Sequence, residues 1–146
     1  MAPDVATTKK TKVLIVGCKN LMIGTCVACS RCIEALNKKQ GQFAGVGDSE
    51  LVGLLDCGGC PGNGMNARLN EFALWNEPDD CLPDQIFIGN CISAKNAAKE
   101  YICPYASNII EVIEKKANHP MASSKTPVTH GTHAKGDKPI KPKKNP

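Results

Sequence analysis

The sequence is poor in aromatic residues, with one Trp, two Tyr and three Phe among 146 residues. Proteins that bind single-stranded nucleic acids depend on aromatic side chains for base stacking, so this scarcity argues against such a function. The net charge of +4 does not change the argument. Residues 135–146 contain five lysines and one aspartate, which together supply the whole excess of positive charge. We therefore expect no nucleic-acid partner.

Long apolar segments are also missing. No run approaches the roughly 18 apolar residues of a membrane-spanning helix. The polar residues at the start lead into the first apolar run without the apolar core of a secretory signal. These absences predict a cytoplasmic protein without a membrane partner. In that compartment, nine cysteines favour metal binding or redox chemistry over disulfides.

Familiar catalytic motifs are absent from the sequence as well. It contains no Gly-x-Gly-x-x-Gly motif for a dinucleotide and no P-loop for a nucleotide triphosphate. No convincing Ser/His/Asp set suggests a hydrolase. The sequence leaves open whether the protein is an enzyme, and the cysteines become its most informative feature.

Three short apolar runs, at residues 13–18, 52–57 and 86–91, each end in a cysteine. Short runs rich in Val, Ile and Leu are typical of buried parallel strands, and the intervals between them are long enough for crossover helices. The carboxyl ends of such strands meet at the edge where open α/β folds bind ligands. We therefore expect Cys18, Cys57 and Cys91 to lie close together at that edge.

The alternation of strand and helix patterns predicts one α/β domain over residues 12–133, between a flexible segment at 1–11 and a disordered basic tail at 134–146. The expected architecture is a three-layer sandwich with a parallel, flavodoxin-like or Rossmann-like sheet of about four strands. Its central strand order should be second, first, third. The strands are expected at residues 12–17, 50–56, 85–89 and 127–129, and the helices at 29–39, 63–75, 93–100 and 104–117.

Two of these helices carry specific expectations. Ser93 is a candidate N-cap for the short helix at 93–100. In the helix at 63–75, apolar residues recur at helical spacing and should pack in the core: Met65, Leu69, Phe72 and Trp75.

The remaining cysteines include two clusters with close spacing. Cys26, Cys29 and Cys32 form C-x2-C-x2-C after the first strand, and Cys57 and Cys60 enclose two glycines after the second. Glycines let the backbone approach a ligand closely, and the start of the following helix would stabilise thiolates. Such pairs suit zinc, an iron–sulfur cluster or a redox dithiol.

Two cysteines stand outside these clusters. We expect Cys81 to pack as an ordinary small apolar residue, the usual behaviour of an isolated cysteine. For Cys103, which precedes a proline, that role and a functional role are equally open.

Several motifs together resemble the CGGC domain family, over about residues 12–133. They are Cys57-Gly-Gly-Cys60-Pro-Gly, Cys18, Gly89-Asn90-Cys91-Ile92, Cys103-Pro104 and Gly131-Thr132-His133. The family consists of small prokaryotic proteins regarded as metal-binding modules. The resemblance implies a set of metal ligands, in which Cys29 could replace Cys26: Cys18, Cys26, Cys32, Cys57, Cys60, Cys91, Cys103 and His133. The chain departs from the family at Tyr105, where relatives often have histidine.

Three functions remain open on the sequence alone. The first is binding of an iron–sulfur cluster or zinc, as a carrier, sensor or electron-transfer module with a redox protein as a further partner. The second is a thiol-disulfide oxidoreductase in which Cys57 is the more exposed, attacking thiol of the Cys57/Cys60 pair. The third is a structural zinc domain that presents a surface to a partner.

Overall fold

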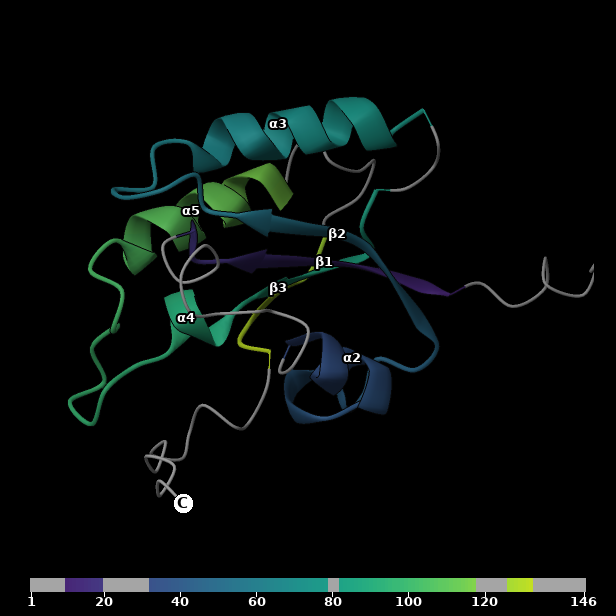
Figure 1. Ribbon diagram of the computed structural model, residues 1–146, viewed down its shortest axis with the longest axis horizontal. Coiled ribbons are helices and arrows are strands. Elements are labelled where there is room, and N and C mark those ends of the chain that lie inside the picture. The colour runs from purple at the N-terminus through teal and green to yellow at the C-terminus, as the bar shows by residue number, and fades with distance from the viewer. Residues whose placement is uncertain (1–9, 20–31, 79–81, 118–125, 133–146) are drawn as a thin grey trace, which may run out of the picture.

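The computed structural model describes residues 10–19, 32–78, 82–117 and 126–132. Four strands form an all-parallel sheet in the order β2-β1-β3-β4 (Figure 1). They are β1 (Thr11–Gly17), β2 (Ser49–Asp56), β3 (Gln85–Ile88) and β4 (Val128–His130). The predicted parallel sheet, its central order and its short fourth strand are confirmed.

Helices cover both faces of the sheet, which confirms the three-layer α/β architecture (Figure 1). One face packs against α3 and α5, and the opposite face packs against α2 and the short 3₁₀ helix η3. The helical elements are α2 (Glu34–Lys38), η3 (Gly41–Phe43), α3 (Met65–Asn76), α4 (Asn90–Ser93) and α5 (Ala106–Ala117). Within the described parts of the chain, none of these helices is long and apolar enough to cross a membrane.

Alternate residues of the central strand β1 pack against the helices on opposite faces of the sheet. Leu14 and Val16 pack with α3 and α5, whereas Val13 and Ile15 pack with α2 and η3. Side chains alternate between the two faces of a strand, so a strand that is covered on both sides must be apolar at every position. This is why β1 appears in the sequence as a continuous apolar run.

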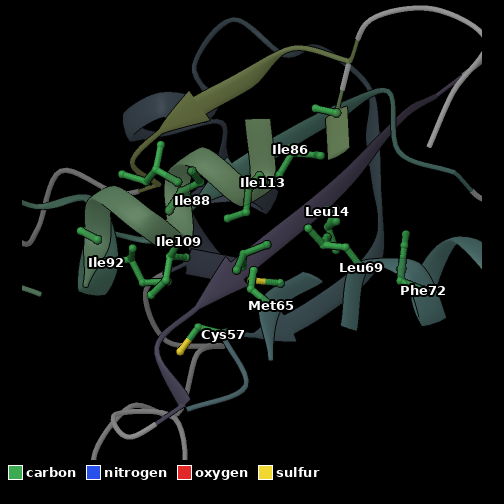
Figure 2. Packing of buried hydrophobic residues seen from close by; sticks show 14 residues of the cluster. Leu14, Cys57, Met65, Leu69, Phe72, Ile86, Ile88, Ile92, Ile109 and Ile113 are labelled. Atoms are coloured by element: carbon green, nitrogen blue, oxygen red, sulfur yellow. The ribbon is translucent and has the colours of Figure 1, made fainter. Parts of the chain in front are cut away.

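The apolar stripe on α3 is buried at three of its four predicted positions. Met65, Leu69 and Phe72 lie in the core (Figure 2), but the side chain of Trp75 is 71% exposed. With 3.6 residues per turn, Trp75 falls to one side of the line through the other three. Its indole N–H donates to the Glu71 carboxylate at 3.0 Å on the helix surface. The prediction that Trp75 belongs to the core is wrong.

The short helix predicted at 93–100 is also wrong, because α4 ends at Ser93 instead of beginning there. The Ser93 hydroxyl donates back to the carbonyls at the end of β3 and is not an N-cap. Beyond α4, the Asn96 side chain accepts the backbone N–H groups of Ala98 and Glu100. Asparagine competes with helical hydrogen bonding in this way, and Lys95 instead forms an antiparallel bridge across the resulting loop.

Candidate thiol site at the carboxyl edge

The three strands that precede cysteines end at the same level. Gly17 of β1 pairs with Asp56 of β2, and Val16 pairs with Ile88 of β3. Cys18 and Cys57 are the next residues after β1 and β2, and Cys91 lies in α4, which directly follows β3. The expectation that these three cysteines share the carboxyl edge is therefore confirmed.

Two of these thiol segments are in direct contact. The backbone N–H of Cys18 donates to Sγ of Cys91 at 3.0 Å. Gly89 allows this approach, because a Cβ atom at that position would lie 3.2 Å from the same Sγ. The turn after β3 therefore holds its thiol against the end of β1.

The loop after β2 places its two thiols in different environments. Cys57 is 3% exposed and belongs to the core cluster between the sheet and α3 and α5 (Figure 2), whereas Cys60 is exposed. Cys57 is buried because it continues directly from β2 into this core. The prediction that Cys57 is the more exposed thiol is wrong, and Cys60 has that position.

The backbone of this loop is fixed by short contacts. The Asp56 carboxylate accepts the N–H of Gly58 at 2.8 Å and pairs with the Arg68 guanidinium at 3.1 Å. Gly58 has a φ of +82°, and a Cβ there would lie 2.9 Å from Cα of Gly64. Only glycine combines this conformation with such a close backbone approach. The glycine next to Cys57 is therefore needed to fold the loop back onto the start of α3.

Cys103, just before α5, packs against the same core cluster as Cys18, Cys57 and Cys91. Burial raises the pKa of its thiol, and the charges of Cys18, Cys60 and Cys57 raise it further, against a lowering by the backbone N–H of Tyr105. Charges act in this way only between neighbouring groups, so four thiols from three segments are gathered here. Cys103, whose role the sequence left open, therefore lies among the thiols at the carboxyl edge.

Cys32 reaches the same edge from the opposite face of the sheet. Its Sγ lies 3.2 Å from Oγ1 of Thr132, which follows β4. The backbone N–H of Thr132 donates to Oδ1 of Asn90, the residue before Cys91. Sequence reasoning missed Asn90 and Thr132 as site residues, although both stand beside a ligand candidate in the Gly-Asn-Cys and Gly-Thr-His motifs.

Other predicted residues are not part of this arrangement or cannot be placed in it. Cys26, Cys29, Cys81 and His133 lie outside the described residues. Within the described ranges, no group of three or more His, Cys, Asp or Glu side chains is arranged to hold a metal ion. The described thiols are thus gathered at one edge without forming a complete coordination site.

Two surface hollows lined by described residues, one beside α3 and one beside α5, lie elsewhere. One, of about 490 Å³, lies between β2 and α3 and includes Trp75 in its lining. The other, of about 440 Å³, is lined by residues of α5 together with Tyr101 and His130. Nε2 of His130 lies 2.9 Å from Oε1 of Glu114. Neither of these hollows is lined by a cysteine, so neither is part of the thiol site.

The fold and the site together define a parallel α/β domain with cysteines gathered at the carboxyl edge of its sheet. The chain belongs to the CGGC domain family, whose model matches residues 12–133. It is also 33% identical, over 127 residues, to an uncharacterized protein, MJ0582, of Methanocaldococcus jannaschii. The aligned region covers 84% of this chain and 86% of the relative. No solved structure matches the chain significantly.

Proposed function

We propose that this protein binds a metal ion or an iron–sulfur cluster through the cysteine thiolates at the carboxyl edge. The observation that carries the proposal is the gathering of Cys18, Cys57, Cys60 and Cys103: Cys18 and Cys103 pack against the core cluster that contains Cys57, and the charges of Cys18, Cys60 and Cys57 help to raise the pKa of the Cys103 thiol. A bound cation reverses that relation, since it attracts every thiolate and favours its ionised form. The protein would then act as a carrier, a sensor or an electron-transfer module with a redox protein as its partner.

The chemistry of the donors fits this proposal. Thiolates are soft ligands that suit zinc and iron–sulfur clusters better than magnesium or calcium. We propose as ligands the residues that the family resemblance implies: Cys18, Cys26, Cys32, Cys57, Cys60, Cys91, Cys103 and His133. The described thiols do not complete a site by themselves, so binding requires side-chain rotation or donors from Cys26, Cys29 and His133.

The different exposure of Cys57 and Cys60 supports a second candidate, a thiol-disulfide oxidoreductase. In that reaction the exposed Cys60 thiolate would attack a substrate disulfide, forming a mixed disulfide and releasing one substrate thiolate. The buried Cys57 thiolate would then attack Sγ of Cys60 and release the second substrate thiolate. The resulting Cys57–Cys60 disulfide would be reduced again by a thiol reductant.

Anaerobic purification with elemental analysis and a visible spectrum tests the first proposal. We expect stoichiometric zinc or iron, and for a cluster an absorption band near 400 nm, roughly where thiolate-ligated iron absorbs. Serine is a harder ligand that zinc and iron hold poorly. Cys57→Ser and Cys60→Ser should therefore lose most of the metal, with Cys81→Ser as the matched control.

The outcomes separate the candidate functions. Retention of metal by both Cys57→Ser and Cys60→Ser, with loss of thiol exchange, would overturn metal binding at this pair in favour of the oxidoreductase. Unfolding of the parent protein when zinc is removed would instead point to a structural zinc domain.

A further inference from the structure

Thr132 is fully buried, with 0% of its side chain exposed, yet each of its polar groups has a partner. Its N–H donates to Asn90 Oδ1 at 2.9 Å, and its carbonyl accepts the N–H of Gln42 at 3.0 Å. Its hydroxyl lies 3.2 Å from Sγ of Cys32, one hundred residues away in the sequence. A buried hydroxyl is unfavourable unless it is hydrogen-bonded. The contact with Cys32 therefore explains how a threonine is accommodated at this buried position.

We propose that Thr132 is a positioning residue of the thiol site, whose hydroxyl holds the Cys32 thiol at the carboxyl edge while Asn90 holds Thr132 in place. This inference rests on the proposed function where it concerns metal affinity. The placement of Cys32 itself can be tested without any metal.

A hydroxyl is suited to this role because it can both donate and accept a hydrogen bond. It can accept from the Cys32 thiol before a metal binds, and it can donate to the thiolate afterwards. Partners that orient a metal ligand in this way change metal affinity substantially when they are removed. Valine has the same shape as threonine but can do neither, and serine can do both.

Asn90 connects the contact between Cys32 and Thr132 to the turn that carries Cys91. Two adjacent side chains in the turn that follows β3 accept hydrogen bonds from different segments. Asn90 accepts the N–H of Thr132 after β4, and Cys91 accepts the N–H of Cys18 after β1. Gly131, with a φ of +123°, brings the chain back towards this turn, and its N–H donates to the carbonyl of Ile88 at 2.7 Å. The position of Cys32 is thereby fixed relative to Cys91 through Thr132 and Asn90.

Zinc affinity, measured by competition with a chromogenic chelator, tests the metal-dependent part. We expect Thr132→Val to weaken zinc binding by about 10-fold or more, the usual effect of losing a partner of a ligand. Thr132→Ser should stay within about threefold of the parent, because it keeps the hydroxyl. Thr129→Val on β4 is the matched control and should bind as the parent does. Parent-like affinity of Thr132→Val, or equal weakening by Thr132→Ser, would overturn the proposal.

Alkylation of Cys32 in the metal-free protein, followed by mass spectrometry, separates this proposal from the function. At about pH 10 most cysteine thiols are ionised, so the rate reports how firmly the thiolate is held and shielded. We expect Cys32 to react several-fold faster in Thr132→Val, with the parent rate in Thr132→Ser and an unchanged rate at Cys60. Asn90→Ala should also accelerate the reaction of Cys32, and it serves as the test if Thr132→Val does not fold.

These two measurements fail independently. If the parent binds neither zinc nor iron but Cys32 responds as expected, the proposed function fails and the positioning role stands. If Cys32 reacts at the parent rate in both Thr132→Val and Asn90→Ala, the positioning role is refuted, whatever metal the protein binds.

Discussion

The Sγ atom of Cys91 accepts the backbone N–H of Cys18 at 3.0 Å, and this bond joins the ends of the two central strands. A main-chain N–H that is shielded from water needs an acceptor. Here the acceptor is a side chain that also belongs to the set of thiols. The Cys91 sulfur therefore both joins the ends of β1 and β3 and is one of the thiols gathered at the carboxyl edge.

Replacing Cys91 by alanine removes that acceptor. We expect a loss of about 1–3 kcal/mol in the free energy of unfolding, the usual cost of leaving a shielded N–H without a partner. Cys91→Ser keeps an acceptor and should lose less. Urea unfolding of the metal-free protein measures both, and Cys60→Ala, at an exposed position, should stay within about 0.5 kcal/mol of the parent. Equal stability of Cys91→Ala and Cys60→Ala would contradict the prediction.

Phe72 and Trp75 provide a matched pair on the same helix. Phe72 is 8% exposed and lies in the core, whereas Trp75 is 71% exposed. We expect Phe72→Ala to cost about 3–5 kcal/mol and Trp75→Ala to remain within about 0.5 kcal/mol of the parent, both by urea unfolding. The chain has one tryptophan, so its fluorescence should show the red-shifted emission of an indole in water. A large loss of stability in Trp75→Ala would show that the indole is part of the core after all.

Stability of the metal-free protein should fall as the pH rises above the ordinary range of thiol ionisation. Burial first, and then the charges of Cys18, Cys60 and Cys57, raise the pKa of Cys103 in the folded protein. The folded state therefore holds this proton more tightly than the unfolded state. Its contribution to stability is complete below the unfolded pKa and is lost as the pH rises through the folded pKa.

Urea unfolding at a series of alkaline pH values measures this loss. Cys103→Ser lacks the titrating thiol and should show a shallower decline than the parent under the same conditions. A decline of equal steepness in the two proteins would exclude Cys103 as a source of the pH dependence.

The sheet could be predicted from the sequence because its signals are local. Residues 13–16 of β1 are covered on both faces and are all apolar, and parallel pairing then brings Cys18 and Cys57 to a common edge. The positions that were predicted wrongly depend on features that the pattern of apolar residues does not report. Trp75 follows Phe72 at helical spacing but lies to one side of the buried stripe on α3 and is exposed, and Asn96 accepts nearby backbone N–H groups where the pattern suggested a helix.

The same distinction applies within the thiol site. The spacing of Cys57 and Cys60 identifies a thiol pair, but the burial of one member depends on how β2 meets α3 and α5. The contact between Cys32 and Thr132 spans one hundred residues, and no periodicity or spacing can encode it. Long-range hydrogen bonds of this kind are visible only once the chain is folded.

We expect the loop that carries Cys57 and Cys60 to be most sensitive to substitution of Asp56. Its carboxylate accepts the N–H of Gly58 and pairs with Arg68, which also donates to the Asp56 carbonyl at 3.2 Å. Asp56→Ala removes both side-chain interactions and should cost about 1–3 kcal/mol by urea unfolding. Most of this cost belongs to the Gly58 bond, since a partly exposed ion pair contributes about 0–1 kcal/mol.

Asp56→Asn separates the two interactions, because its amide oxygen can still accept the N–H of Gly58 while the charge is lost. We expect it to be less destabilised than Asp56→Ala, and Asp48→Ala, at an exposed position in the loop before β2, to match the parent within about 0.5 kcal/mol. The buried Cys57 thiol should also react faster with a thiol reagent in Asp56→Ala, because the loop that covers it is less firmly held. Unchanged reactivity of Cys57 in a folded Asp56→Ala variant would show that Asp56 does not hold this loop, and that the glycine contacts alone determine its shape.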